Sequence, residues 1–267
     1  MENIMVITVK KSEKIWTVIH SRPEVRNAMD PTSSDQLYQK FVEFDKEDSA
    51  RVAVLSGDNG YFCAGYDLRH AKDLNVRIER GEYEFDPNDA YPKGPMGPTR
   101  LQLKKPIIAA IAGPAVAGGM ELALWANIRV MEKSAYFGVY CRRWGIPLID
   151  GGTVRLPRII GEGRAMDIVL TGRKVSSEES YKIGLCEYLV EDGKSLEFAE
   201  ALALNLSNLP QSCMRSDMIS TSEQNGVSIK EALKNEWLLS KKELKRQGLK
   251  GADRFVSGKG RHGQPDT

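Results

Sequence analysis

The chain has 267 residues and a formal net charge of +2, from 38 basic and 36 acidic residues. This near balance gives no excess of basic charge that would indicate nucleic-acid or membrane-surface binding. The longest apolar run, residues 107–112, is far too short to span a bilayer. With 41% hydrophobic residues the chain can bury a sizeable core. We therefore expect a soluble globular protein with neither nucleic-acid nor membrane partners.

The cysteines indicate a reducing compartment. They are dispersed and form no C-x-x-C pair, unlike a disulfide framework: Cys63, Cys141, Cys186 and Cys213. The histidines do not join them at metal-ligand spacing, so no metal site is expected. The N-terminus lacks a long apolar stretch followed by a small-residue cleavage site. Together these features predict a cytoplasmic protein.

The first elements follow from hydrophobic periodicity. β-Branched residues alternate over residues 6–19 around a Lys-Ser-Glu-Lys turn, which predicts an N-terminal hairpin. Residues 33–45 carry an apolar stripe typical of a helix, with Ser33 or Ser34 as its N-cap. Residues 51–56 read as a strand that ends in a Gly-Asp-Asn-Gly turn.

A Pro- and Gly-rich stretch, residues 86–100, separates these elements from the next group, and we interpret it as a loop rather than a domain linker. Residues 106–112 predict a buried strand, and Gly118 opens a helix that ends near residue 126. Strand 135–137 and helix 163–170 continue the alternation, which is typical of an α/β protein. We place the α/β core in residues 1–195 and a helical region in residues 196–267, which ends in a Gly-rich basic tail.

Two bends after strands are candidates for ligand contact: residues 62–68 and residues 112–124. Glycine in each lets a ligand approach the backbone closely. At the second bend, the free N–H groups and dipole of a helix start would stabilise an oxyanion placed at Gly118. Glu121 follows by about one turn, on the same face. Burial would raise the pKa of its carboxyl and the helix start would lower it, so the net direction is open. Each bend alone is also common in purely structural roles.

In combination, the two bends and their neighbours resemble the enoyl-CoA hydratase/isomerase (crotonase) superfamily. The resemblance covers most of the chain. Its segments, in order, are Arg22-Pro23, Asn27-Ala28-Met29, Phe62-x-Ala64-Gly65-x-Asp67, Lys105 to Ile111, Gly118-Gly119-x-Glu121-Leu122-Ala123, Phe137-Gly138, Gly151-Gly152-Thr153, Arg155-Leu156-Pro157, Leu170-Thr171-Gly172 and Ala252-Asp253-Arg254-Phe255.

The resemblance implies a spiral of ββα repeats, with C-terminal helices that mediate trimerisation and trimers that often pair into hexamers. It makes the backbone N–H groups of Tyr66 and Gly118 the oxyanion-hole donors to a thioester carbonyl. It also places coenzyme A against Ala64 and Asp67, with basic residues near the CoA phosphates at positions 22 and 26, here Arg22 and Arg26. Either arginine could equally be an ordinary surface charge.

The sequence departs from the family pattern at the second catalytic glutamate. Glu121 matches the first, but Cys141 stands where the second is expected, and a neutral thiol replaces a carboxylate poorly at neutral pH. We expect that thiol to be inert rather than nucleophilic. Asp150, in a segment shifted by one residue from the family register, is the candidate replacement. Its alternative role is to cap the helix that begins near residues 151–153.

These residues favour an acyl-CoA-processing lyase of the EC 4.2.1 type, an enoyl-CoA hydratase or isomerase with Glu121 and Asp150 as its acid/base pair. The acyl-CoA would be its substrate, and no cofactor is implied. Two alternatives stay open. One is another reaction through the same enolate, such as thioester hydrolysis, decarboxylation or carbon–carbon cleavage, and the other is a non-catalytic acyl-CoA-binding protein.

Overall fold

The computed structural model describes residues 5–12 and 14–259. The first four residues, Glu13 of the predicted hairpin turn and residues 260–267 of the basic tail lie outside them. The chain divides into two compact units, Met1–Leu206 and Ser207–Thr267. The first unit therefore extends beyond the boundary predicted at residue 195, because the helix that follows this residue packs on the sheet of the first unit.

A six-stranded sheet in the order β1-β2-β3-β4-β6-β9 forms the framework of the first unit. Strands β1 and β2 pair antiparallel as the predicted hairpin, and every later neighbour pairs parallel. Their bounds are β1 Ile7–Ser12, β2 Ile15–His20, β3 Val52–Gly57, β4 Ile107–Ile111, β6 Ile128–Glu132 and β9 Tyr188–Val190. Strands β3 and β4 confirm the predicted strands at residues 51–56 and 106–112.

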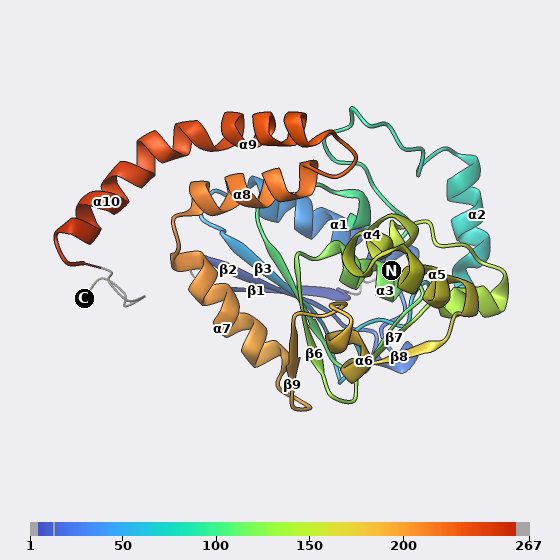
Figure 1. Ribbon diagram of the computed structural model, residues 1–267. Coiled ribbons are helices and arrows are strands. Elements are labelled where there is room, and N and C mark those ends of the chain that lie inside the picture. Colours follow the sequence, from blue (N-terminus) through green and yellow to red (C-terminus); the bar gives the residue numbers. More distant parts are fainter. Residues whose placement is uncertain (1–4, 13, 260–267) are drawn as a thin grey trace. The chain divides into compact units, whose positions relative to one another are not determined.

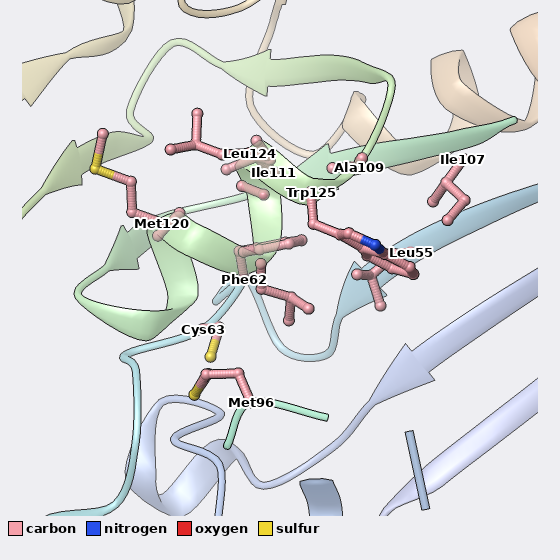
Figure 2. Packing of buried hydrophobic residues seen from close by; sticks show 14 of the residues in the cluster. Leu55, Phe62, Cys63, Met96, Ile107, Ala109, Ile111, Met120, Leu124 and Trp125 are labelled. Atoms are coloured by element: carbon pink, nitrogen blue, oxygen red, sulfur yellow. The ribbon is translucent and has the colours of Figure 1, made fainter. Parts of the chain in front are cut away.

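Successive side chains of the central strands point to opposite faces, and both faces are buried. Val52 and Val54 pack with Ala199 and Ala203 of helix α7 (Ser195–Asn208). Ala53 and Leu55 face the larger core instead. That core includes the apolar stripe of α1 (Pro31–Lys46) and helix α3 (Gly118–Trp125). Figure 2 shows the part of it around Leu55, Phe62 and Trp125, and Figure 1 shows how α7 runs beside the sheet.

A second sheet in the order β5-β7-β8 supports the bend before α3. Its strands are β5 Pro114–Val116, β7 Tyr136–Gly138 and β8 Lys174–Ser176. The remaining helices of this unit are α2 Ala71–Glu79, α4 Gly152–Ile160, α5 Glu162–Thr171 and α6 Ser177–Lys182, with short 3-10 turns at Pro23–Val25, Leu68–His70, Pro98–Arg100 and Tyr140–Trp144. The predicted strand at 135–137 and helix at 163–170 are thus confirmed as β7 and α5.

Helix α1 begins earlier than predicted, and its cap is a different residue. Asp30 is the N-cap, and its side chain accepts a hydrogen bond from the Ser33 N–H at 2.7 Å. Pro31 fixes the first helical φ angle, so the helix starts there. The prediction of Ser33 or Ser34 as the cap was wrong, since both serines lie buried inside the helix.

The second unit is helical. It contains α8 Gln211–Glu223 and α9 Ile229–Glu243, and the chain continues through a π-helical turn, Leu244–Gly248, into α10 Leu249–Val256. Ser228 and Glu231 form a capping box at the start of α9. The Ser216 and Ser240 hydroxyl oxygens lie 3.1 Å apart between α8 and α9. Within the described part of the chain, none of the helices is long and apolar enough to cross a membrane.

Candidate active site

The two glycine-bearing bends lie against each other. The Cys63 N–H donates to the Pro114 carbonyl at 3.0 Å, and the Val116 N–H donates to the Cys63 carbonyl at 3.1 Å. A Cβ at position 119 would lie 2.1 Å from the Cys63 carbonyl oxygen, so this contact requires Gly119. The first bend is thereby fixed to the start of α3.

The Tyr66 N–H is left free by the hydrogen bonds on either side of it. The Met29 N–H donates to the Gly65 carbonyl, and the Asp67 N–H donates to the Met29 carbonyl, both at 2.8 Å. Successive groups of an extended chain point in opposite directions, so the intervening Tyr66 N–H points away from Met29. Among the described residues we find no acceptor for it.

The Gly118 N–H is free because it belongs to the first residue of α3. Ala117 precedes it at φ 53° and ψ −126°, a backbone conformation that is strained for a residue with a Cβ. The Ala117 N–H is anchored to the Gly138 carbonyl at 2.8 Å. A Cβ built on Gly65, next to Tyr66, would lie 3.3 Å from the Gly118 nitrogen. The bends that carry the two free N–H groups therefore converge.

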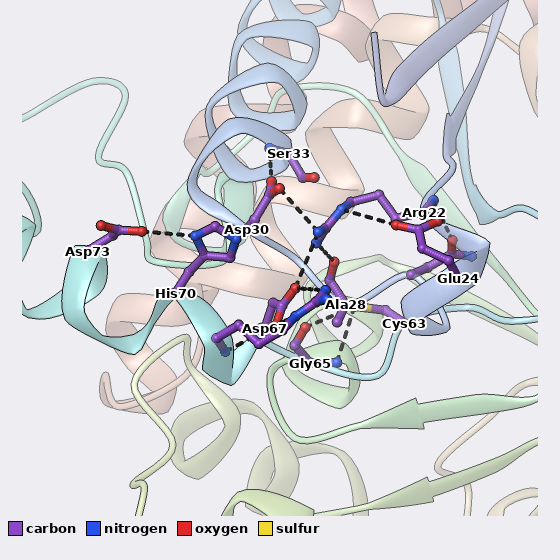
Figure 3. Close-up of polar contacts among 12 residues, drawn as sticks. Arg22, Glu24, Ala28, Asp30, Ser33, Cys63, Gly65, Asp67, His70 and Asp73 are labelled. Atoms are coloured by element: carbon purple, nitrogen blue, oxygen red, sulfur yellow. Dashed lines mark hydrogen bonds and ion pairs between the residues drawn. The ribbon is translucent and has the colours of Figure 1, made fainter. Parts of the chain in front are cut away.

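A charged network holds the first bend (Figure 3). The Arg22 guanidinium donates to the Ala28 carbonyl at 2.6 Å and lies 3.2 Å from Asp67 and 3.3 Å from Asp30. Arg69 also binds Asp67, at 2.6 Å. These hydrogen bonds, those from Arg69 foremost, lower the pKa of the Asp67 carboxyl to about 2. Asp67 thus stays ionised and keeps its bonds at any pH near neutrality.

Glu121 is a buried carboxyl group, 3% exposed, that faces the start of α4. Its Oε1 accepts hydrogen bonds from the Asp150 N–H at 2.9 Å and the Gly152 N–H at 2.8 Å. Burial, and then the nearby Asp150 charge, raise the pKa of Glu121 to about 7, against the opposing effect of these hydrogen bonds. Burial therefore decides the direction of the Glu121 pKa shift, which the sequence left open.

Asp150 is a second buried carboxyl, 2% exposed. Its Oδ1 accepts hydrogen bonds from the Met96 N–H at 3.0 Å and from the Thr99 hydroxyl. Burial raises the pKa of this carboxyl as well. Gly151 is the N-cap of α4, with no side-chain cap, so the capping role considered for Asp150 is excluded. The side chain points to the 96–99 segment instead.

One pocket joins these groups. Its lining contains the residues with the two free N–H groups, both carboxyls and a largely apolar wall. The lining residues in the described part of the chain are Ala64, Tyr66, Leu68, Leu74, Pro95, Met96, Ala117, Gly118, Glu121, Tyr140, Cys141, Trp144, Ile146, Pro147, Ile149 and Asp150. Burial raises the pKa of the Cys141 thiol, with a further contribution from the Glu121 charge. Among the described residues, no group of three or more potential metal ligands is present.

The same arrangement connects the chain with known proteins. A family model described as enoyl-CoA hydratase/isomerase matches residues 10–257. The chain belongs to the enoyl-CoA hydratase/isomerase family. It is 35% identical over 210 residues to the enoyl-CoA hydratase EchA19 of Mycobacterium tuberculosis, covering 74% of this chain and 75% of the relative. It is 34% identical over 196 residues to a carnitinyl-CoA dehydratase of Salmonella typhi, covering 73% and 71%.

Solved structures of the enoyl-CoA hydratase family share the fold. The enoyl-CoA hydratase EchA1 of Mycobacterium marinum superimposes with a TM-score of 0.84 at 26% identity, covering 98% of both chains. An enoyl-CoA hydratase from Bacillus anthracis gives the same TM-score and identity, with 95% and 97% covered. The α/β crotonase-like fold with a helical C-terminal region is thus confirmed. Family membership makes the chain an acyl-CoA-processing enzyme of the hydratase/isomerase type.

Of the site residues predicted from the sequence, the hydratase-type pocket brings together Glu121, Asp150, Tyr66, Gly118 and Ala64. The other three lie outside its lining. Arg22 forms an ion pair with Asp67 of the first bend, and Arg26 is exposed. Contacts of these three residues with coenzyme A stay a prediction.

For two parts of the site, the sequence did not show which side chains make the contacts. One is the 95–99 segment, from which the Met96 N–H and the Thr99 hydroxyl donate to Asp150. The many prolines of this stretch gave no periodicity to follow. The other is the short turn of Tyr140–Trp144, where the sequence singled out Cys141 but did not show that Trp144 also lines the pocket. Arg142, Arg143 and Trp144 follow Cys141 where hydratases of the family usually have aliphatic residues, and this difference was the available signal.

Proposed function

We propose that this protein hydrates 2-enoyl-CoA thioesters, with Glu121 and Asp150 as its acid/base pair. The observation that carries the proposal is the pocket itself. Two unbonded backbone N–H groups on converging bends share it with two buried carboxyls. The coenzyme A thioester is the substrate, and acid/base chemistry by two carboxyls needs no added metal or redox cofactor.

The Tyr66 and Gly118 N–H groups would bind the thioester oxygen. When water adds to Cβ, the electrons of the double bond move toward the carbonyl and place negative charge on this oxygen. Two fixed N–H donors, one on the first bend and one at the start of α3, stabilise that charge, and in a largely apolar pocket each contributes more than it would in bulk water.

The two carboxyls would share one proton. We assign the ionised form to Asp150, because the nearby Arg100 and Arg155 charges partly offset the rise in the pKa of its carboxyl that burial causes. We assign the protonated form to Glu121, whose pKa burial and the Asp150 charge raise to about 7. Asp150 takes a proton from water as the oxygen bonds to Cβ, and Glu121 gives its proton to Cα. The pair ends with one proton, on Asp150, and proton exchange resets it. Movement of a double bond would use the same two groups without water.

The test uses purified protein with crotonyl-CoA, followed by loss of the conjugated thioester absorbance. We expect Glu121→Gln and Asp150→Asn each to lower kcat by about a hundredfold or more. The exposed Glu197→Gln, outside the pocket, is the matched control. In heavy water the product should carry one deuterium at Cα. Full activity of Glu121→Gln, or a product that is not the 3-hydroxyacyl-CoA, would exclude the assignment.

The proposal extends to assembly and location. We infer a homotrimer or hexamer, supported by the apolar side chains that α9 leaves exposed, among them Leu233 and Trp237. A cytoplasmic location is supported by the cysteines, all of which are free thiols.

A further inference from the structure

The pocket wall beyond the carboxyl pair is apolar and reaches the surface. Its outer lining comprises Leu68, Trp144 and Ile149, which are 44%, 69% and 37% exposed. Leu74, Met96 and Ile146 line the same pocket. Large exposed apolar side chains that continue a buried apolar wall indicate a binding surface rather than random exposure.

The charge of the lining restricts what this surface can bind. Among the described residues that line the pocket, only Glu121 and Asp150 are charged side chains in neutral water, and both are acids. Cys141, at the place of the family's second glutamate, adds a neutral thiol to the wall. Arg143 lies outside the lining, and its guanidinium stacks on the Tyr140 ring at 3.7 Å from the centroid. A carboxylate at the free end of the acyl group would be repelled by the negative charge of the acid pair and would find no cationic side chain in the lining.

We propose that this pocket selects uncharged acyl groups long enough to pass from Glu121 to Trp144, and rejects acyl groups that end in a carboxylate. The occupant is the acyl chain of the thioester substrate rather than the coenzyme A moiety, because the phosphates of coenzyme A would find no cationic side chain in this wall. The inference rests on the proposed function for its reaction, but the binding selectivity follows from the lining alone.

The test compares crotonyl-CoA, trans-2-decenoyl-CoA and glutaconyl-CoA as substrates. Each methylene that leaves water against the apolar wall strengthens binding by up to about fourfold, so decenoyl-CoA should have a KM at least about tenfold below that of crotonyl-CoA. Glutaconyl-CoA should be the poorest substrate. Trp144→Ala should raise the KM for decenoyl-CoA about tenfold, and it should raise the KM for crotonyl-CoA by a clearly smaller factor. Tyr181→Ala, at an exposed aromatic residue of α6 outside the pocket lining, is the control and should change neither.

The outcomes separate this inference from the proposed function. Equal KM values for the short and long chains, a preference for glutaconyl-CoA, or an equal effect of Trp144→Ala on all substrates would overturn the inference while hydration still stands. If no enoyl thioester is turned over, the proposed function fails. Calorimetric binding of butyryl-, decanoyl- and glutaryl-CoA to the same variants then decides the inference alone. Tighter binding of decanoyl-CoA that Trp144→Ala removes supports it, and its absence overturns it.

Discussion

At the scale of single residues, the site depends on two carboxyls buried within reach of one another. A buried charge is stabilised poorly by its surroundings, and a second one nearby repels it, so the pair retains a proton that either group alone in water would lose. Glu121 holds this proton to about pH 7. A general acid whose pKa lies near the working pH transfers its proton efficiently in both directions of a reversible reaction.

This assignment predicts a spectroscopic titration in the free enzyme. Infrared spectroscopy should detect a protonated carboxyl that ionises with a midpoint of about 7. The midpoint should move to lower pH in Asp150→Asn, because the repulsion from the Asp150 charge is lost. The band should vanish in Glu121→Gln. If the band persists unchanged in Glu121→Gln, the proton belongs to another group.

The kcat/KM of the wild-type enzyme should fall as the pH rises through the same midpoint, since Glu121 is then ionised and cannot protonate Cα. A profile that rises across this range would assign the base role to Glu121 instead.

At the scale of elements, the orientation of the Tyr66 N–H depends on how the first bend is tied to the chain before α1. Backbone hydrogen bonds to Met29 fix the bend on one side. Arg22 bridges the Ala28 carbonyl, Asp30 at the start of α1, and Asp67. This arginine is therefore suited to position the bend, and truncating it would leave buried polar groups without a partner.

We predict that Arg22→Met lowers kcat about tenfold with a smaller change in KM, because misplacing the donor weakens binding of the transition state more than that of the substrate. Arg22→Lys should restore part of the loss. Arg69→Gln removes the exposed partner of the same Asp67 carboxylate and should stay within about twofold of wild type. A rise in KM alone would instead support the predicted contact of Arg22 with coenzyme A.

The elements with regular periodicity could be predicted from the sequence, and the site only in part. Residues 107–111 are apolar throughout and form a strand, and glycine at position 118 marks the helix start. Proline-rich residues 86–100 give no such pattern, so the Met96 and Thr99 contacts to Asp150 could not be foreseen. The role of Asp150 also depends on the direction in which its side chain points, and the preferences of helix caps do not decide this direction. Hydrogen bonds to residues 51 or more positions away in the sequence determine it.

At the scale of the whole molecule, folding stability should depend on a buried histidine. Both ring nitrogens of His20 are buried without a hydrogen-bond partner among the described residues. Burial, with a contribution from Arg22, lowers the pKa of this imidazole from 6.5 to about 4. Between these values the unfolded chain binds a proton that the folded chain does not, so stability falls as the pH falls.

We expect the free energy of unfolding to drop by about 2 kcal/mol from this group between pH 7 and pH 5, at about 1.4 kcal/mol per pKa unit. Urea unfolding of wild type and His20→Leu at the two pH values measures it. In His20→Leu the free energy of unfolding should not show this drop of about 2 kcal/mol between pH 7 and pH 5, whatever the stability of the variant at pH 7. An identical pH dependence in both proteins would assign acid sensitivity to other groups.

The oligomer is the second prediction at this scale. Light scattering of the purified protein should give the mass of a trimer or hexamer. Trp237→Asp on α9 should lower that mass, because a charge would be buried in the proposed contact. Phe85→Asp, an exposed residue of the first unit, is the control. A wild-type mass equal to that of a single chain would refute the proposed assembly.

The positive φ angle of Ala117 has a consequence for how the enzyme binds its substrate. Such a conformation costs an alanine about 1–3 kcal/mol, and it is present before any ligand arrives, held by the Gly138 carbonyl and by the packed start of α3. The free energy of folding of the first unit thus compensates for the strain that aligns the Gly118 N–H. The donors are preorganised, and none of the substrate's affinity is consumed in bringing them into line at the moment of reaction.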